Sequence, residues 1–269
     1  MTTTRLHWTD LPASVHRAVA ARLGTPVLAA QTVSAGFNSE IAAKLSTARG
    51  AVFVKGMQLS HPRVWTQRRE REVNPYVEGL APTVLWHLDV DGWSLVAFEH
   101  VEARHADYRE AGDLELVVEA LGRLGRVPCP PIELRRAEQR WAAYVDDPEV
   151  LSRFGGGCLL HTDLNNENVL IRESHALLVD WAWATRGAPW IDPALWVVWL
   201  IAAGGHGPAA AEAWAARVPA WQTGDPTVVD VFAQAQARMW VEIAGEEPDP
   251  WTARLNRAAQ RWARFRGHR

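Results

Sequence analysis

The sequence predicts an α+β fold in which a small antiparallel β-sheet with one interrupting helix comes first and a larger, mainly helical part follows. Short β-rich runs separated by hairpin-type turns concentrate between residues 26 and 99, whereas helical spacing of apolar residues dominates from about residue 101 onward. The chain has 269 residues, 48% hydrophobic and 22% charged, which is enough apolar material for a sizeable core and excludes a disordered polymer. We therefore expect two unequal lobes, residues 1–100 and 101–269.

The N-terminal lobe is predicted to open with an amphipathic helix, because Thr9 and Asp10 favour a helix start, apolar side chains follow at helical spacing and Gly24 ends the run. Turn signals at residues 48–50 and 89–92 indicate antiparallel hairpins. A charged helix interrupts the strands, and Pro75 kinks or ends it. The expected strands cover residues 26–33, 40–46, 51–55, 83–88 and 93–99, and the charged helix covers residues 63–72.

The C-terminal lobe is predicted to be mainly α-helical, with Gly and Pro at the joints. Its expected helices cover residues 113–124, 131–144, 192–203, 209–218, 225–243 and 250–265. Three brief apolar runs, at residues 158–160, 169–171 and 177–179, are typical of buried strands that present polar loops to a cleft. We therefore expect the chemistry of the protein in these loops.

The charge balance excludes a large electrostatic field as the basis of binding. Lys and Arg total 28 against 31 Asp and Glu, and the net charge of −3 argues against nucleic acid or an anionic membrane as a partner. The two cysteines, Cys129 and Cys158, lack metal-binding spacing and fit a reducing compartment. The N-terminus has no signal-peptide pattern, and the longest apolar run, residues 193–203, is too short to cross a bilayer. We therefore expect a cytoplasmic protein.

The most specific pattern in the chain is H-x-D-x-x-x-x-N over residues 161–168, followed by Asp180 at the end of the next apolar run. In phosphoryl transfer such a set gives one carboxylate, here Asp163, to the acceptor hydroxyl, while an amide oxygen and a second carboxylate bind magnesium beside the phosphates of ATP. Asn168 and Asp180 are the candidate magnesium ligands. Any one of these residues alone would more often be a turn residue that caps local backbone, but their joint spacing favours function.

Lys55 is the candidate phosphate contact. The chain has two lysines, Lys44 and Lys55, among its 28 cations, and Lys55 ends the run 51–55, from which a compact ammonium can reach a phosphate. Phe53 lies two residues earlier, on the same face of the strand, where it could cover an adenine ring. A strand-end lysine is commonly a solvated edge charge, and this is our interpretation of Lys44.

Two further segments are candidates for holding the phosphates and Lys55. The charged helix could place a carboxylate against that lysine, with Glu70 favoured over Glu72, although a solvated face is the common meaning of such a charge run. The turn over residues 34–40 could bring backbone N–H groups over phosphates, with Asn38 and Ser39 as its candidate contacts. The pattern G-x-x-x-x-G-K-[ST] does not occur in the sequence, so a P-loop enzyme is not expected.

This order of a glycine-containing turn, a strand lysine, a helix glutamate, H-x-D-x-x-x-x-N and a strand-end aspartate resembles the aminoglycoside phosphotransferase family, small-molecule kinases with a bilobal protein-kinase-like fold. The resemblance covers about residues 30–200. It implies an N-terminal nucleotide-binding lobe and a C-terminal lobe for catalysis and acceptor binding, with ATP or GTP and Mg²⁺ as cofactors. By matching position it makes Asp163 the catalytic base, Lys55 the contact of the α- and β-phosphates and Glu70 the ion-pair partner of Lys55.

The resemblance also assigns residues outside these motifs. Glu99 and Val101 fall where the inter-lobe hinge of the family hydrogen-bonds adenine through its backbone, and His161 would brace the catalytic loop. Asp192 matches an aspartate that follows the metal-binding loop in the family, and we expect it to be structural rather than catalytic. The dipeptide Trp-Ala at 181–182 in place of Phe-Gly, together with the lack of an A-P-E segment, makes a protein substrate unexpected.

We therefore expect an enzyme that transfers the γ-phosphate of ATP to a hydroxyl of a small molecule. Residues 205–269 contain seven acidic residues against eight arginines, which does not favour a polycationic aminoglycoside as the acceptor. The same segment holds tryptophans that could lock helices together or stack on a flat or sugar-like ligand. We expect a neutral or weakly charged antibiotic, or a nucleoside-like metabolite, as the acceptor.

Three alternatives stay open on sequence alone. The first is a non-catalytic pseudokinase that binds a nucleotide, and the joint presence of the lysine and the three oxygen-bearing motif residues argues against it. The second is a structural protein whose tryptophan-rich helices dock a partner. The third is a housekeeping kinase for choline, homoserine or a sugar, which the sequence leaves open, as it does the oligomeric state.

Overall fold

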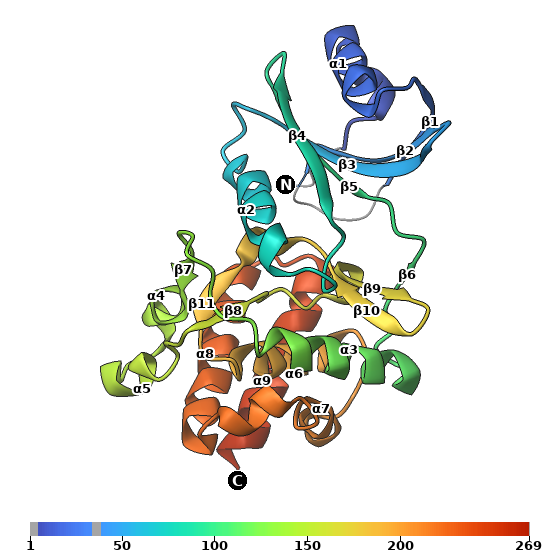
Figure 1. Cartoon of the computed structure of the whole chain (residues 1–269). Helices are drawn as coiled ribbons and strands as arrows, with labels where there is room; N and C mark the ends of the chain where they lie inside the picture. Colours follow the sequence, from blue (N-terminus) through green and yellow to red (C-terminus); the bar gives the residue numbers. More distant parts are fainter. Residues whose placement is uncertain (1–4, 34–38, 269) are drawn as a thin grey trace. The chain divides into compact units, whose positions relative to one another are not determined.

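The structure, a computed structural model, describes residues 5–33 and 39–268. Its contacts divide the chain into two compact units, one made of Met1–Glu102 with Val179–Ala182 and the other of Ala103–Leu178 with Trp183–Arg269. Figure 1 follows the chain through both units. The predicted α+β fold class, with an antiparallel sheet followed by a mainly helical part, is confirmed.

The first unit is built on a five-stranded antiparallel sheet with the strand order β1-β2-β3-β5-β4. All five predicted strands and both predicted helices are present. Gly24 ends the first helix in the left-handed conformation, with φ 67°, as the position after a helix favours. The elements are η1 (Trp8–Asp10), α1 (Ala13–Leu23), β1 (Val27–Thr32), β2 (Ile41–Thr47), β3 (Gly50–Gln58), α2 (Trp65–Val73), η2 (Asn74–Tyr76), β4 (Val84–Val90) and β5 (Trp93–Glu99).

One face of this sheet is buried under α1. Val15 and Val19 of α1 belong to the same core cluster as Val54 of β3 and Leu95 of β5, and all four side chains are fully buried. Because side chains alternate between the faces of a strand, Lys55, the neighbour of Val54, points to the opposite face. The sheet therefore separates a packed structural face from the face that carries the candidate phosphate contact.

The second unit is mainly helical, with two small three-stranded sheets of order β10-β9-β6 and β7-β11-β8. Its helices are α3 (Ala111–Leu124), α4 (Ala137–Arg140), α5 (Pro148–Ser152), α6 (Ile191–Ala202), α7 (Pro208–Ala215), α8 (Pro226–Ala244) and α9 (Pro250–Gly267). Its strands are β6 (Arg104–His105), β7 (Arg135–Arg136), β8 (Cys158–Leu160), β9 (Val169–Arg172), β10 (His175–Leu178) and β11 (Thr185–Gly187). The 3-10 turns after residue 102 are η3 (Ala142–Tyr144), η4 (Asn166–Asn168), η5 (Trp181–Trp183) and η6 (Pro219–Thr223).

Helix α6 forms the centre of this unit, since all twelve of its residues are buried. Beside it an edge-to-face aromatic cluster fills the core: Phe232 of α8 contacts Trp141, Phe154 and Trp190, with ring centroids 5.1 to 5.3 Å apart. Trp262 of α9 is fully buried as well. Trp141, Trp190 and Trp262 therefore act as packing residues.

The predicted helix over residues 131–144 is wrong. The structure has the short strand β7, the single turn α4 and the 3-10 turn η3 in its place. Arg135 and Arg136 pair in parallel with Thr185 and Arg186 of β11. A strand pairing between segments far apart in the sequence therefore overrides the local helical spacing, which is a weak preference by comparison.

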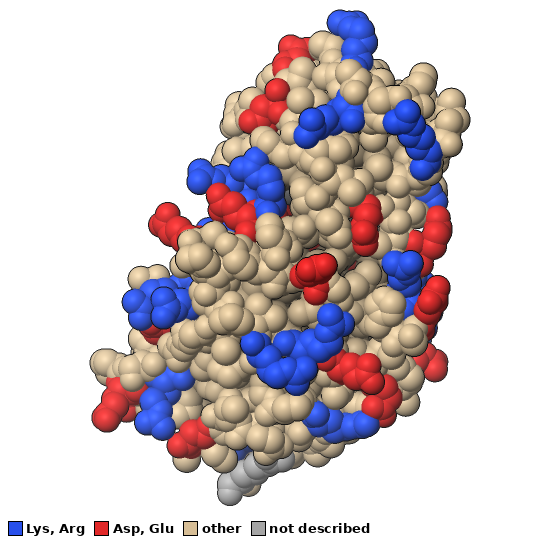
Figure 2. Space-filling model, viewed as in Figure 1, with Lys and Arg blue, Asp and Glu red and all other residues tan. Residues whose placement is uncertain are grey.

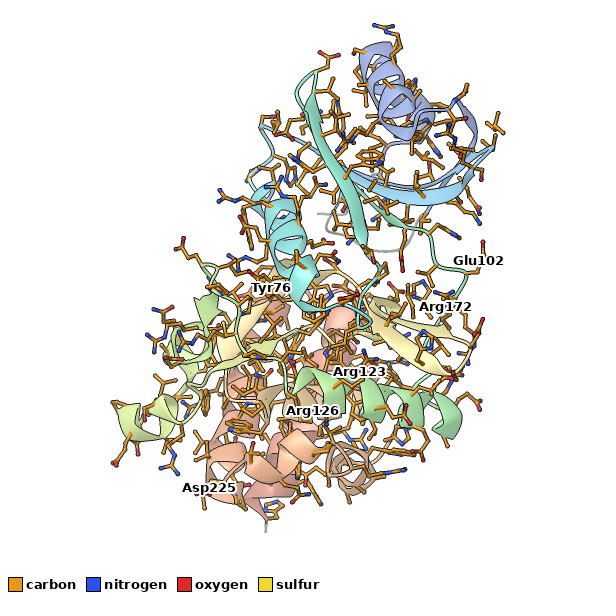
Figure 3. The ribbon with its side chains drawn as sticks, viewed as in Figure 1. Tyr76, Glu102, Arg123, Arg126, Arg172 and Asp225 are labelled. Atoms are coloured by element: carbon orange, nitrogen blue, oxygen red, sulfur yellow. The ribbon has the colours of Figure 1, made fainter. Side chains whose placement is uncertain are left out.

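Charges of both signs lie interspersed on the face of the molecule shown in Figure 2. Figure 3 labels Arg123 and Arg126 at the end of α3, where both are exposed and where cations complement the carbonyl end of a helix. No helix within residues 5–33 and 39–268 combines the length and the apolar character that crossing a bilayer requires. Cys129 and Cys158 both carry free thiols.

The C-terminal helix α9 is anchored by a buried charge. Arg266, only 6% exposed, donates from Nε to Oε1 of Glu212 at 2.6 Å and from Nη1 to Oδ1 of Asp230 at 2.5 Å. The indole Nε1 of Trp262 donates to the same Glu212 oxygen at 2.6 Å. Glu212 therefore joins α7 to two side chains of α9.

Replacing Glu212 with Ala should lower the free energy of unfolding by about 3 kcal/mol, because it strips a buried guanidinium of one of its carboxylate partners. The matched control is Glu115→Ala, which removes the partner of Arg217 in an ion pair whose side chains are both about half exposed, and should cost less than about 1 kcal/mol. Urea denaturation measures both losses. Equal losses in the two variants would contradict the anchoring role of Glu212.

Candidate active site

In the first unit, Lys55 lies in a cluster of buried charged side chains with Glu70 and Asp180, called here the lysine cluster. Its Nζ donates to the two carboxylate oxygens of Glu70 at 2.8 and 3.0 Å and lies 3.9 Å from Oδ1 of Asp180. The side chains of Lys55, Glu70 and Asp180 are 14%, 5% and 13% exposed. Glu72, the other candidate partner, pairs instead with the exposed Arg68.

Burial and charge oppose each other in the lysine cluster. Burial raises the pKa of Glu70 to about 7; the charge of Lys55 opposes this rise and that of Asp180 adds to it. Burial by itself would lower the pKa of Lys55, but attraction to the two carboxylates outweighs it and the net shift is upward. The cluster therefore holds a charged ammonium at a fixed place in a poorly solvated environment.

An apolar surface adjoins the ammonium on the same face of the sheet. Phe53 of β3 is the cross-strand partner of Phe98 of β5, and Nζ of Lys55 lies 5.7 Å from the centre of the Phe98 ring. Glu99 ends β5 and donates its N–H to the carbonyl of Thr83 at 2.8 Å. Val101, two residues beyond the strand, lies in irregular backbone.

Of the two predicted contacts in the turn after β1, Asn38 lies outside the described residues and Ser39 is buried. The carbonyl oxygen of Ser39 accepts from Nε of Arg5 at 3.4 Å, and a second Arg5 nitrogen donates to the carbonyl of Val33. Burial lowers the pKa of Arg5, against the attraction of nearby Asp180. Sequence reasoning missed this cation, because no motif surrounds it.

In the second unit, the loop between β8 and β9 carries Asp163. Asn168 donates from Nδ2 to Oδ2 of Asp163 at 3.0 Å and to its main-chain oxygen at 3.2 Å. The ring of His161, which is fully buried, accepts the N–H of Asp163 at Nδ1 over 3.2 Å. In the motif H-x-D-x-x-x-x-N, the histidine thus contacts the backbone of Asp163, and the asparagine contacts both its backbone and its side chain.

Asp192 of α6 holds the start of the same loop. Its two carboxylate oxygens accept the N–H groups of His161 at 2.8 Å and of Thr162 at 2.9 Å. Thr162 has φ 64°, a conformation that a β-branched residue adopts only under strain of about 1–3 kcal/mol. Burial raises the pKa of Asp192 to about 6, while the two N–H donors and Arg140 pull it down.

Two residues without any motif support this loop as well. The O–H of Tyr108, which is buried, donates to the carbonyl of Leu164 at 2.8 Å. Arg140 donates from Nη1 to Oγ1 of Thr162 at 2.5 Å. Burial lowers the pKa of Arg140 to about 10, and the charge of Asp163 opposes this change. No sequence signal marked Tyr108 or Arg140, because the groups they contact are far away along the chain.

A cavity of about 370 Å³ lies beside Asp163, wholly within the second unit, and we call it the Asp163 cavity. Its size is in the range of small-molecule sites. Of the tryptophans in residues 205–269, Trp240 is in its wall, together with Trp183 and Trp199 from earlier in the chain. The lining residues are Arg135, Arg140, Tyr144, Thr162, Asp163, Trp183, Leu195, Val198, Trp199, Gln236, Met239, Trp240 and Ile243.

The predicted magnesium ligands have the right chemistry for that ion. In the described part of the chain, no three His, Cys, Asp or Glu side chains gather closely enough to hold a metal by themselves. Asn168 and Asp180 offer oxygen atoms, and magnesium is commonly bound by one or two protein ligands with phosphates and water completing its shell. Both hydrogen bonds of the Asn168 side chain use Nδ2, so its oxygen Oδ1 accepts none from a described residue. Each of these two oxygen donors, taken by itself, has the chemistry that magnesium bound together with a nucleotide requires.

Comparison with known proteins identifies the fold. No family model and no curated protein sequence matches the chain. The choline kinase LicA from Streptococcus pneumoniae is similar in structure, with 14% identity, a TM-score of 0.63 and coverage of 93% of this chain and 98% of that one. The aminoglycoside phosphotransferase APH(4)-Ia is similar to the same degree, with 14% identity, a TM-score of 0.63 and coverage of 92% and 98%. The resemblance predicted from the sequence is therefore confirmed at the level of the fold.

The raised pKa of Asp192 predicts a pH dependence of stability. A carboxyl whose pKa is about 6 when folded and 3.8 as a free group stabilises the fold below about pH 4, and this contribution is lost as the pH rises through 6. The free energy of unfolding of the native chain minus that of Asp192→Asn should fall by about 2–3 kcal/mol between pH 4 and pH 7.

Urea denaturation at several pH values measures this difference, with Asp146→Asn as the control, because Asp146 is 85% exposed and pairs at the surface with Arg238. That control should leave the pH profile almost unchanged. A difference for Asp192→Asn that stays constant from pH 4 to pH 7 would show that the carboxylate is not destabilised by its burial.

Proposed function

We propose that this protein is an ATP- and magnesium-dependent O-phosphotransferase that acts on a small molecule. The observation that carries the proposal is the buried contact of Lys55 with Glu70 and Asp180. Taking these charges out of water is unfavourable, and binding of phosphate is a role that accounts for an ammonium held in such a place. The ammonium lies where a point charge could neutralise phosphate oxygens.

The first unit would bind the nucleotide. Lys55 contacts the α- and β-phosphates, Glu70 fixes its ammonium, and Phe53 covers the adenine ring. Backbone groups complete the site, with hinge contacts at Glu99 and Val101 and phosphate contacts at Asn38 and Ser39. LicA has been crystallised in complex with AMP, and APH(4)-Ia in complexes with AMP-PNP or ADP, which supports a nucleotide as the ligand. ATP is the proposed donor, and GTP is the competitor to test.

The Asp163 carboxylate would orient the acceptor hydroxyl and take its proton. The acceptor oxygen then bonds to the γ-phosphorus while the bond from that phosphorus to the β–γ bridging oxygen breaks, and ADP leaves. Asn168 and His161 keep the aspartate in position through the hydrogen bonds described above. Asn168 and Asp180 would hold the magnesium ion, which when bound neutralises charge on the phosphate oxygens.

The acceptor would enter the Asp163 cavity. APH(4)-Ia has been crystallised with hygromycin B, which supports a small molecule as the acceptor. We propose a neutral or weakly charged antibiotic, as in a resistance enzyme, or a nucleoside-like metabolite. No nucleic acid or membrane partner is proposed, and we place the activity in the cytoplasm, where ATP is available and free thiols stay reduced.

Magnesium-ATP should raise the melting temperature of the native chain by several degrees at a concentration of about 100 times its Kd, because binding to the folded state alone contributes about 2.7 kcal/mol. Lys55→Met and Asp180→Asn should each remove this shift. The matched control is Lys44→Met, since Lys44 is the other lysine of the chain and pairs with the exposed Glu102. A shift that survives in Lys55→Met, or that is absent from the native chain, would overturn the proposed nucleotide site.

Replacing Asp163 with Asn should lower kcat by about 10²–10⁴-fold, because the amide cannot accept the acceptor proton, while the thermal shift with magnesium-ATP is kept. ADP release coupled to NADH oxidation, measured with a panel of acceptors, gives kcat for this variant and for the surface control Asp146→Asn. Unchanged turnover in Asp163→Asn would remove Asp163 from the mechanism. Nucleotide binding without transfer to any acceptor would instead favour the pseudokinase alternative.

A further inference from the structure

The walls of the Asp163 cavity come from matching stripes on two helices. Leu195, Val198 and Trp199 of α6 line it at the spacing i, i+3 and i+4. The α8 stripe has the spacing i, i+3, i+4 and i+7, and runs Gln236, Met239, Trp240 and Ile243. Two stripes of this kind normally meet in a closed apolar seam, but here they bound a cavity of about 370 Å³. One residue in them, Gln236, is not apolar.

Gln236 is a buried amide without a partner. Its side chain has no exposed surface, and neither Nε2 nor Oε1 makes a hydrogen bond to any residue in the described part of the chain. Leaving a buried donor and acceptor unpaired is unfavourable, and native proteins rarely keep such a group without a reason. The cavity that Gln236 lines is the place from which a ligand could supply both partners.

An amide presents a donor and an acceptor side by side in one plane. The complementary surface is a group with an adjacent acceptor and donor, such as the edge of a nucleobase, which Gln reads in a bidentate manner in nucleic-acid recognition. Planar rings of the ligand would find partners in Trp183 and Trp240, which line the same cavity and are each only partly buried. The wall thus offers stacking surface, and its amide, covered in this structure, can pair with a base edge once a neighbouring side chain moves.

The charges of the cavity select against cations. Arg135 and Arg140 line it, and of the described lining residues Asp163 is the one acidic side chain. All hydrogen bonds of Arg140 to described residues use Nη1, which leaves its Nη2 and Nε without such a bond. A ligand with several ammonium groups would meet two guanidinium groups and find, on the described walls of the cavity, a single carboxylate, that of Asp163. An uncharged ligand would not be repelled by the two guanidinium groups.

We propose that the acceptor is an uncharged nucleoside or a nucleoside-like antibiotic, with a sugar hydroxyl at Asp163, the planar base against Trp183 and Trp240, and the base edge hydrogen-bonded to Gln236. This inference rests on the proposed phosphotransferase function and makes Gln236 a specificity-determining residue. Since the amide is covered in this structure, the base must displace a neighbouring side chain. Met239, unbranched and flexible, lies on the same stripe and is suited to such a shift.

The experiment uses the full chain with magnesium-ATP and three kinds of acceptor: the uncharged nucleosides uridine, cytidine and adenosine, the polycation kanamycin, and choline. ADP release is followed for each, and phosphorylated product is identified by mass. We expect turnover with at least one nucleoside and none with kanamycin or choline. In Gln236→Leu, KM for the nucleoside should rise about tenfold or more, while KM for ATP stays the same.

Two further measurements separate recognition from folding. Gln236→Leu should keep or raise the melting temperature, because an apolar side chain of similar size replaces an unpaired amide. Gln234→Leu is the matched control, since Gln234 is exposed on the same helix and is not among the lining residues; it should leave KM for the nucleoside unchanged. A large fall in the melting temperature of Gln236→Leu, or an unchanged KM for the nucleoside, would overturn the role of Gln236.

Different experimental outcomes overturn the proposed acceptor class and the proposed phosphotransferase function. Magnesium-ATP binding without binding or turnover of any of the three nucleosides overturns the acceptor class and leaves the proposed function standing. Turnover of kanamycin or choline in preference to the nucleosides also overturns the acceptor class and leaves the phosphotransferase function standing. Absence of magnesium-ATP binding to the native chain overturns both.

Discussion

The candidate catalytic loop depends on one buried carboxylate. Asp192 accepts the N–H groups of two consecutive residues, His161 and Thr162, and thereby fixes the backbone immediately before Asp163. Thr162 is held with a positive φ that its side chain disfavours, so the geometry of the loop is imposed by α6 and not by local preference. Because α6 is buried along its whole length, it provides a rigid support for this contact.

Other polar and charged side chains in the molecule are also held in positions that stability alone does not favour. Lys55 and its two carboxylate partners are removed from water, although a surface position would carry no desolvation penalty. The amide of Gln236 is buried with neither of its polar atoms paired among the described residues. Strain and unpaired polarity of this kind concentrate at functional sites, because binding requires groups that are not already satisfied within the protein.

The sequence was sufficient to predict those features whose signals lie within a short stretch of the chain. The strands, the cap at Gly24 and the candidate residues Lys55 and Asp163 follow from alternation, turn chemistry and motif spacing, and these features are set within a few residues. The segment 131–144 was misassigned because its pairing with β11 is invisible in a local window. No local pattern marks Arg140, which lies in that segment, or Gln236, an ordinary polar residue in a helix, as a site residue. Arg140 is identified by its hydrogen bond to Thr162 and Gln236 by its place in the wall of the Asp163 cavity, and both features depend on remote parts of the chain.

Transfer of phosphate from ATP to a hydroxyl is tested most directly by ³¹P NMR of the full chain with magnesium-ATP and, in separate samples, an uncharged nucleoside, kanamycin or choline. With at least one acceptor we expect a new phosphomonoester resonance that grows in step with the loss of the γ-phosphate resonance of ATP. An intact γ-phosphate resonance, or its conversion to inorganic phosphate alone with every acceptor supplied, would contradict it.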